Sequence, residues 1–440
     1  MLNVKWTMPD PVFLSPSNYH QIDFKPCHSA IDESMNWPSG TCSYLDYAFD
    51  AGLSRHCGWI CKIDDPALFS ASKVYKRGVY AGSNEFSKAL NSSSSAYPIQ
   101  IDRLINSDIF QQAGSLLIVD SNVEKAWASK LPKKRISVEA LETLKNLETS
   151  ASLSRKIRDE SPKEIVIVGG GIVGDIAAFC AANLNIPFTL VPTTLLSMAD
   201  ACVGGKTGVN HPKFGKNQIG LFAFPTGVHI YTEWLESLDE RHMKSGLAEC
   251  IKHCLIDGNE RLFSMLSSEK KLAGLSEWIG EVVEIKAKVV SRDPYEAGER
   301  ATLNLGHTFG HALESLSQMQ KPTDHILHGE AVAYGLLFSI LLSRQQNTIS
   351  AQKSQQLIGS LQKSSLDLSQ KKFMNSFATR PEFSEIWQKI LSDKKSQSAE
   401  SSEWILLSER GISKNGDSFL FSIKKDVVKD VYEDFLKILL

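Results

Sequence analysis

Short apolar runs alternate with glycine-rich breaks in the middle of the chain. Residues 164–168 form a β-branched run, three glycines follow at 169–171, and a helix-like apolar stretch covers 176–183. A second strand pattern at 188–191 ends in Pro-Thr-Thr. A strand, a glycine turn and a helix in this order suit the binding of a pyrophosphate. Glycines let the backbone come close to the ligand, and the helix N-terminus supplies free N–H groups. The pattern predicts an α/β nucleotide-binding unit with threonine hydroxyls at the ligand-binding edge of the sheet.

The second half of the chain has a different pattern. Arg300, Asn304, His307 and His311 recur at spacings of four, three and four, which would place them on one face of a helix. Such a face is costly against an apolar core, since an unpartnered buried polar group costs about 1–3 kcal/mol. We therefore expect a helix that lines a polar cavity. Near the C-terminus, residues 404–422 alternate like a short hairpin.

Candidate metal ligands lie close to this polar stretch. Glu249 and Lys252 stand at i and i+3, and His328 precedes a long apolar run. One glutamate and two histidines are the ligand set of a catalytic zinc with an open position. The zinc-protease motif HExxH is excluded, because Thr308 occupies the position of its glutamate.

A lysine-rich, glycine-rich segment spans residues 200–217. It resembles a phosphate-binding P-loop, but Ala201 stands at the first glycine position and no helix-forming sequence follows. Lys206, Lys216 and Asn217 are better interpreted as phosphate and nucleotide contacts on a mobile loop.

Eight motifs in order resemble those of the 3-dehydroquinate synthase family, in the sugar-phosphate cyclase superfamily. They are GGGxxGD, PTTLL, DxxVGGKTGVN, GKN, SGLAExIK, KAKVV, RxxLNxGHTxGHA and LHGEAV, and the resemblance covers residues 120 to 395. It implies an N-terminal Rossmann-like nucleotide-binding domain and a C-terminal, mostly helical metal-binding domain. We place an extension of unknown role at 1–65, the NAD-binding domain at 66–225 and the metal- and substrate-binding domain at 226–440.

The resemblance also implies three sets of site residues. Zn2+ or Co2+ would be held by Glu249, His307 and His328. The NAD-binding residues would be Asp120, Asn122, Glu142, Lys145, Gly170, Gly171, Ile172, Asp175, Thr193, Thr194, Leu196, Lys216, Trp234 and Ser237. The substrate pocket would contain Asp200, Lys206, Asn217, Lys252, Lys286, Arg300, Asn304, His311, Lys394 and Lys395.

The implied activity converts 3-deoxy-D-arabino-heptulosonate 7-phosphate to 3-dehydroquinate and phosphate. NAD would oxidise the substrate transiently, phosphate would leave by elimination, and re-reduction and an aldol closure would follow. Lys286 and Arg300 suit the substrate carboxylate, Arg300 through its bidentate fork. Two alternatives stay open: a cyclase of secondary metabolism (amino-dehydroquinate or valiolone type) and a metal-dependent polyol dehydrogenase. The lysines suited to phosphate argue against the dehydrogenase.

Two positions depart from the family pattern. The family usually carries an arginine before the strand that ends in Pro-Thr-Thr, whereas residues 180–192 contain no basic residue. Lys213 is a candidate substitute; otherwise phosphate binding is weaker or the substrate differs. Asp293-Pro294 stands where the family usually has a second acid.

Composition limits the remaining classes. A net charge of −2 over 440 residues argues against a nucleic-acid partner, and no apolar run reaches the roughly 18 residues of a membrane span. We expect a cytoplasmic enzyme, a homodimer by resemblance, with reduced thiols. Cys202, Cys250 and Cys254 are expected to be packing residues. A zinc site at Cys57 and Cys61 is disfavoured, because the spacing of the candidate ligands is irregular.

Overall fold

The structure is a computed structural model that describes residues 79–80, 97–211, 215–268, 275–394 and 399–439. The chain divides into two compact units. Unit 1 runs to Thr193 and resumes from Gly204 to Ser237. Unit 2 combines the short segment Thr194–Val203 with the chain from Leu238 onward. The extension at 1–65, with Cys57 and Cys61, lies outside the described residues.

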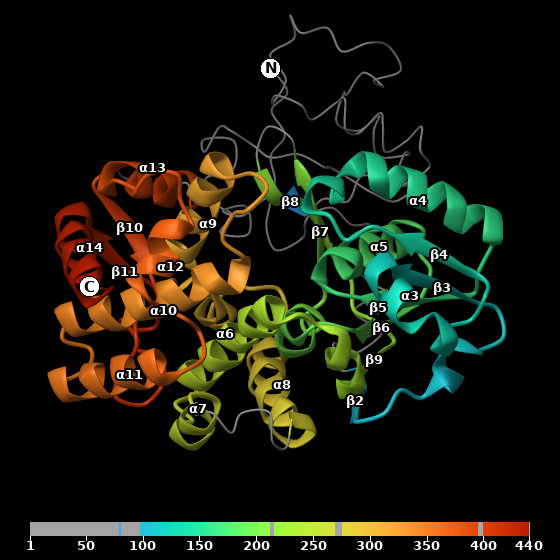
Figure 1. The fold of residues 1–440 in the computed structure, drawn as a ribbon, viewed down its shortest axis with the longest axis horizontal. Coiled ribbons are helices and arrows are strands. Elements are labelled where there is room, and N and C mark those ends of the chain that lie inside the picture. The colour runs from blue at the N-terminus through green and yellow to red at the C-terminus, as the bar shows by residue number, and fades with distance from the viewer. Residues whose placement is uncertain (1–78, 81–96, 212–214, 269–274, 395–398, 440) are drawn as a thin grey trace, which may run out of the picture. The chain divides into compact units, whose positions relative to one another are not determined.

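A six-stranded parallel sheet forms the centre of unit 1, in the order β2-β9-β6-β5-β3-β4. Its strands are β2 (Ile99–Asp102), β3 (Ser115–Asp120), β4 (Arg135–Val138), β5 (Glu164–Gly169), β6 (Phe188–Pro192) and β9 (Gly227–Tyr231). The helical segments are η4 (Ser107–Phe110), α3 (Ser121–Trp127), η5 (Ala128–Lys130), η6 (Glu142–Leu144), α4 (Leu147–Glu160), α5 (Gly171–Asn183) and η8 (Thr232–Ser237). Figure 1 shows α4 and α5 along one side of this sheet.

The apolar run at 164–168 is a strand because it is buried on both faces of the sheet. Ile165 and Ile167 pack in one cluster with α4 and α5, and Val166 and Val168 on the opposite face are also buried. Parallel strands covered on both sides characteristically read as continuous hydrophobic runs. The predicted strand, glycine turn and helix are therefore confirmed as β5, the Gly169–Gly171 turn and α5.

The glycine-rich segment after Gly204 is regular, where we expected a mobile loop. Strands β7 (Lys206–His211) and β8 (Gly215–Phe222) pair antiparallel, and β1 (Val79–Tyr80) adds to β8. Gly208 permits this pairing, because a Cβ there would lie 3.0 Å from the Ile219 carbonyl oxygen. The expectation of an irregular loop was wrong, since its glycines serve close strand packing.

The unit boundary also differs from the expected position at 225. Strand β9 begins at Gly227 and pairs with both β2 and β6, so it belongs to the sheet of unit 1. From Gly204 the chain stays in unit 1 up to Ser237, and it returns to unit 2 at Leu238.

Unit 2 is mostly helical. Its helical segments are η7 (Ser197–Ala201, a π-helix), α6 (Glu240–Asp257), α7 (Glu260–Leu266), α8 (Leu275–Arg292), η9 (Glu299–Asn304), α9 (His307–Gln320), α10 (His328–Gln345), α11 (Ala351–Lys363), α12 (Gln370–Asn375), α13 (Phe383–Lys394) and α14 (Lys425–Leu439). Helices α9, α10, α13 and α14 share one hydrophobic cluster with the hairpin β10 (Ser401–Trp404) and β11 (Phe421–Lys424). The predicted C-terminal strand pair is present with shifted bounds, since β10 ends at Trp404, where the first strand was expected to begin, and Trp404 pairs with Phe421. The predicted fold class, α/β with a mostly helical C-terminal part, is confirmed.

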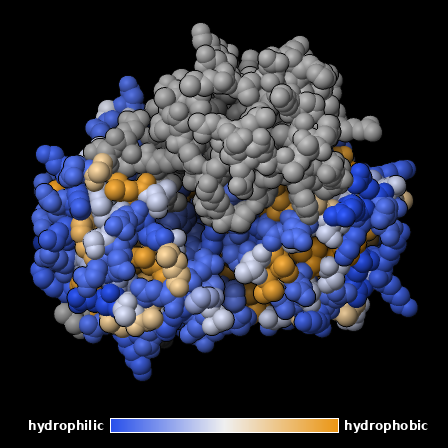
Figure 2. Space-filling model, turned by 90° about the horizontal axis from the view of Figure 1, so that it is seen from above, coloured by the Kyte–Doolittle hydropathy of each residue, from blue (hydrophilic) through white to orange (hydrophobic). Residues whose placement is uncertain are grey.

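The described surface is mainly hydrophilic on the face shown in Figure 2, with small scattered hydrophobic spots. Large hydrophobic side chains that are exposed, among the described residues, stand at Leu104, Leu141, Tyr295, Met319 and Met374. Among the residues that the structure describes, no helix is long and apolar enough to cross a membrane.

Candidate active site

Helix α6 of unit 2 carries a carboxylate, an ammonium and an imidazole that are all buried. Asp239 caps its start by accepting a hydrogen bond from the His242 N–H, and Gly258 ends it in the left-handed conformation. Glu249, Lys252 and His253 are at most 1% exposed and lie on one helical face by their spacing. The Lys252 ammonium lies 2.5 Å from Glu249 Oε2. A buried carboxylate of this kind requires cationic partners.

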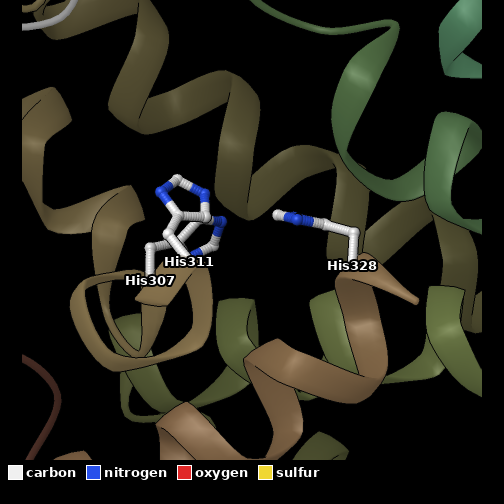
Figure 3. A group of neighbouring side chains, drawn as sticks. All are labelled: His307, His311 and His328. Carbon is white, nitrogen blue, oxygen red and sulfur yellow. The ribbon is translucent and has the colours of Figure 1, made fainter. Parts of the chain in front are cut away.

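Two histidines approach the Glu249 carboxylate from neighbouring helices. His307 is the first residue of α9 and His328 the first of α10. Their Nε2 atoms lie 3.5 Å and 3.2 Å from the same oxygen, Glu249 Oε1. Figure 3 shows the His328 side chain extending towards the His307 and His311 rings.

The other ring nitrogen of each histidine has its own partner. His307 Nδ1 lies 3.1 Å from the Leu305 carbonyl oxygen, so Nδ1 carries the proton and donates it. His328 Nδ1 lies 3.1 Å from Glu314 Oε2. Such partners fix the tautomer that leaves the Nε2 lone pair free for a metal. If both rings were neutral, both lone pairs would face a carboxylate oxygen, which is repulsive unless a cation, either a proton on His328 or a metal ion, lies between them.

The pKa values of these groups indicate the same preference for a cation. Burial would raise the pKa of Glu249, but Lys252 and the histidines hold it well below its usual range. Burial lowers the pKa of His307 well below its usual value, and Lys252 adds to the effect. Burial also opposes charge on His328, yet its contacts with Glu249 and Glu314 raise its pKa to about 10.

Glu249, His307 and His328 therefore fit a divalent metal. Both carboxylate oxygens of Glu249 are buried, and neither has a hydrogen bond of acceptable geometry. Two other groupings are close enough to ligate, namely His311 with the two histidines and Asp200 with Glu249 and His253. The second grouping is less suitable, because Lys252 and Lys286 already neutralise Asp200. The first lacks a carboxylate, and Glu249 is the group that both Nε2 atoms approach.

Asp200 is the centre of a second charged cluster in unit 2. It lies on the π-helix η7, a form that is rare and frequent at functional sites. Its Oδ1 atom lies 3.4 Å from Lys252 Nζ, 3.1 Å from Lys286 Nζ and 3.1 Å from His253 Nε2. Burial would raise the pKa of Asp200, but the two lysines keep it well below its ordinary value. Burial lowers the pKa of Lys286, and Lys252 and Arg300 add to the shift while Asp200 opposes it.

The expected single helix from Arg300 to His311 is interrupted. Residues 299–304 form a 3-10 helix, and Gly306 at φ 79° separates it from α9. A Cβ on Gly306 would meet the Leu336 backbone nitrogen at 3.0 Å, so glycine is required both for its conformation and for packing on α10. The prediction of one continuous face was wrong. The four polar residues nevertheless stay in unit 2, with Arg300 only 2% exposed and bonded to the Pro294 carbonyl oxygen.

Most predicted nucleotide contacts lie in unit 1, at the carboxyl edge of the parallel sheet. Asp120 ends β3 and caps α3 through the Asn122 N–H at 2.8 Å. Gly170 caps α5 beside it, and Ile172 follows in the first turn of α5. A Cβ on Gly169 would lie 3.2 Å from Asp120 Cβ, so this glycine allows the two strand ends to approach. The buried Thr193 hydroxyl, at the end of β6, has no hydrogen-bond partner and is available to a ligand. Thr194 and Leu196 belong to unit 2.

A polar network joins the β7–β8 hairpin to the rest of unit 1. Lys145, 5% exposed, donates to Asp175 on α5 and to Asn217 on β8. Glu142 Oε1 accepts a hydrogen bond from the Asn210 side chain at 2.7 Å. Predicted nucleotide residues and a predicted substrate residue therefore share one network. Lys206 and Lys216 lie on the same two strands.

Two other predicted contacts lie at the end of unit 1. The Trp234 indole is 1% exposed and packs edge-on against Trp127. Ser237 accepts a hydrogen bond from Trp127 Nε1 at 2.7 Å. Trp127 is a neighbour that the sequence pattern did not indicate.

Some predicted residues have no described side chain. Lys394 is the last residue of α13, while Lys395 and Lys213 lie outside the described residues. Cys202, Cys250 and Cys254 are buried free thiols, in agreement with a packing role.

Two residues near the metal site were missed from the sequence. His253 lies next to Lys252 and was not singled out. Glu314 lies seven residues after His307, and this spacing of two helical turns was a signal that could have placed both on one face.

Comparison with known proteins agrees with this arrangement. Residues 135–245 match the family model described as 3-dehydroquinate synthase N-terminal, and residues 246–396 match the C-terminal one. A 3-dehydroquinate synthase from Methylacidiphilum infernorum is 36% identical over 304 residues, which are 68% of this chain and 78% of the relative. One from Acidithiobacillus ferrooxidans is 38% identical over 58% of this chain and 75% of the relative. One from Prochlorococcus marinus is 44% identical over 48% of this chain, but the match spans only 59% of that relative.

Solved structures show the same fold. A 2-deoxy-scyllo-inosose synthase complexed with carbaglucose-6-phosphate, NAD+ and Co2+ has a TM-score of 0.66 at 22% identity, covering 76% of this chain and 96% of the other. A 2-epi-5-epi-valiolone synthase from Streptomyces hygroscopicus, with NAD+ and Zn2+ bound, has a TM-score of 0.66 at 19% identity, covering 78% and 97%. The parallel sheet with its glycine turn, the Glu-His-His cluster and the two family models together show that the chain belongs to the 3-dehydroquinate synthase family.

Proposed function

We propose that the protein is a 3-dehydroquinate synthase that uses NAD and a divalent metal. It would act as a carbon–oxygen lyase on 3-deoxy-D-arabino-heptulosonate 7-phosphate and form 3-dehydroquinate and phosphate. The relatives that carry this name and the two matching family models support the activity. The observation that carries the proposal is the convergence of His307 and His328 on the Glu249 carboxylate.

The bound groups would supply the redox and Lewis-acid chemistry, since NAD takes up and returns a hydride and a divalent ion polarises a substrate hydroxyl. Glu249, His307 and His328 would hold the metal, and the carboxyl edge of β3, β5 and β6 would hold NAD. Structures of two cyclases with the same fold contain NAD+ with Co2+ or Zn2+.

The charge balance of unit 2 supports an anionic substrate. Lys252, Lys286 and Arg300 are buried cations, and Asp200, Glu249 and Glu314 are the carboxylates among them, so these side chains balance one another before a metal binds. A bound divalent metal would add two positive charges and leave the site with a surplus of positive charge. A surplus of buried positive charge is costly unless an anion compensates for it. A substrate with a phosphate and a carboxylate meets this need, and a neutral polyol does not.

The proposal is tested by following phosphate release and NADH absorbance together in purified, metal-loaded protein. We expect continuous phosphate release from the heptulosonate phosphate without a net rise of NADH, because each oxidation is reversed in the same site. A rise of NADH equal to product formation would support the polyol dehydrogenase. Turnover of sedoheptulose 7-phosphate or the amino analogue in preference to the heptulosonate would support a cyclase of secondary metabolism. The homodimer and the cytoplasmic location remain predictions, and light scattering tests the first.

A further inference from the structure

Asn210 has no assigned role, yet it is the centre of the polar network in unit 1. Its backbone N–H donates to the Lys145 carbonyl oxygen at 2.7 Å. Its side-chain Nδ2 donates to Glu142 Oε1 at 2.7 Å and to the Glu142 carbonyl oxygen at 3.2 Å. Its Oδ1 accepts a hydrogen bond from the Asn217 N–H at 2.9 Å. One side chain therefore contacts two segments that are distant in sequence.

The residues on either side have different expected ligands. Glu142 and Lys145 belong to the predicted nucleotide site, and Asn217 belongs to the predicted substrate pocket. Asn217 has a positive φ of 52°, a backbone conformation that residues other than glycine adopt at a cost. Asn210 stabilises that conformation through the Asn217 N–H, and Lys145 holds the Asn217 side-chain oxygen at 2.5 Å. Asn217 is thus fixed at both its backbone and its side-chain oxygen.

We propose that Asn210 is a positioning residue that ties the turn carrying Glu142 and Lys145 to the strand carrying Asn217. It contacts neither ligand directly. Its side-chain N–H group orients Glu142, the expected nucleotide contact. Its side-chain oxygen orients Asn217, the expected substrate contact. The inference rests on the proposed function, because it takes Glu142 as a nucleotide contact and Asn217 as a substrate contact.

Two variants separate the two halves of the amide. Asn210→Ala removes both contacts, so we expect the NAD dissociation constant and the substrate KM each to rise about 5- to 20-fold. Asn210→Asp keeps an oxygen that accepts from the Asn217 N–H, but it places a carboxylate against Glu142. For Asn210→Asp we expect the NAD dissociation constant to rise about tenfold or more, with KM at saturating NAD within about twofold of wild type.

The measurements use the full chain with metal bound. Calorimetry gives the NAD dissociation constant without turnover, and phosphate release gives KM and kcat. Hydrogen exchange of the Asn217 N–H should accelerate in Asn210→Ala and stay slow in Asn210→Asp. Gln100→Ala is the control, since it removes an exposed amide of unit 1 that bonds to Asp102 on strand β2.

The outcomes are distinct. The inference would be overturned if the Ala and Asp variants changed the NAD dissociation constant and KM equally. It would also be overturned if both variants kept the wild-type values of these constants. A merely structural role would lower the melting temperature and the active fraction of every variant without this split. If the wild type binds NAD but does not release phosphate from the heptulosonate phosphate, the proposed function fails, and the NAD and exchange measurements still decide the role of Asn210. A wild type that does not bind NAD would overturn both.

Discussion

His307 and His328 differ in the residues that orient their rings. A backbone carbonyl fixes His307, whereas the Glu314 carboxylate fixes His328. A backbone contact cannot be removed by substitution, but the carboxylate can. Glu314 is therefore the point at which metal affinity is open to change without replacement of a ligand.

Glu314→Gln should bind metal about 10-fold more weakly, and Glu314→Ala up to about 100-fold, because the charged acceptor behind His328 is lost. His307→Ala should lose stoichiometric metal altogether. Competition with a chromophoric chelator measures the affinities, and elemental analysis measures the content. His242→Ala, on the exposed side of α6, should behave as wild type. Unchanged affinity in Glu314→Ala would contradict the assigned role of the carboxylate.

Arg300 is expected to decide substrate choice. Arg300→Ala should lower kcat/KM for the heptulosonate phosphate by roughly 10²-fold or more, because removal of one member of a buried charge pair costs several kcal/mol. Arg300→Lys should recover only part of this loss, since the ammonium lacks the bidentate fork.

A substrate without the carboxylate provides the comparison for Arg300. Sedoheptulose 7-phosphate should be a poor substrate of the wild type, and its turnover should be nearly insensitive to Arg300→Ala. Arg292→Ala is a matched control, because this arginine is exposed and pairs with Glu299. Equal loss with both substrates would leave only the broader cyclase assignment.

At the scale of elements, the sequence predicted the strands and turns that are determined by consecutive residues. The run at 164–168 and the glycines after it have the strand and turn patterns in consecutive residues, and the structure contains both. The break before His307 was missed because spacings of four, three and four fit a helix. Only the positive φ of Gly306 and its contact with α10 reveal it. The β7–β8 hairpin was missed because its glycines serve cross-strand packing, which sequence spacing does not show.

The contact between α10 and the start of α9 depends on a glycine in the middle of a helix. A Cβ on Gly335 would lie 1.9 Å from the Gly306 carbonyl oxygen, whereas Gly359 in α11 has no atom within 4 Å of its Cβ position. Gly335→Ala should therefore destabilise the fold by about 3 kcal/mol or more and displace His307. Gly359→Ala should stabilise it by about 0.5–1 kcal/mol through helix propensity. Urea unfolding and metal content measure both variants; similar behaviour of the two would contradict this packing argument.

At the scale of the whole molecule, the two units are expected to bind different ligands, NAD mainly in unit 1 and the metal in unit 2. A metal that binds only the folded state stabilises it by about 2.7 kcal/mol at 100-fold excess over its dissociation constant. Chelation should therefore lower the melting temperature by several degrees, at about 2–4 °C per kcal/mol. Hydrogen exchange should accelerate in α6 and at the starts of α9 and α10. Exchange in α4 and α5 should respond to NAD instead. Acceleration confined to α4 and α5 after chelation would place the metal elsewhere.

The segment Thr194–Val203 has a consequence for how the chain is made. Leu195, Met198 and Ala199 are at most 1% exposed, and η7 packs against α6 and α8, with Gly246 of α6 directly against Leu196. A ribosome completes this segment before either helix exists. At a synthesis rate of about 5–20 residues per second, the apolar side chains of this segment lack their packing partners for several seconds, until α6 and α8 are made. The nascent chain is therefore expected to need chaperone protection in that interval, and no single cut yields two fragments that each hold one complete unit.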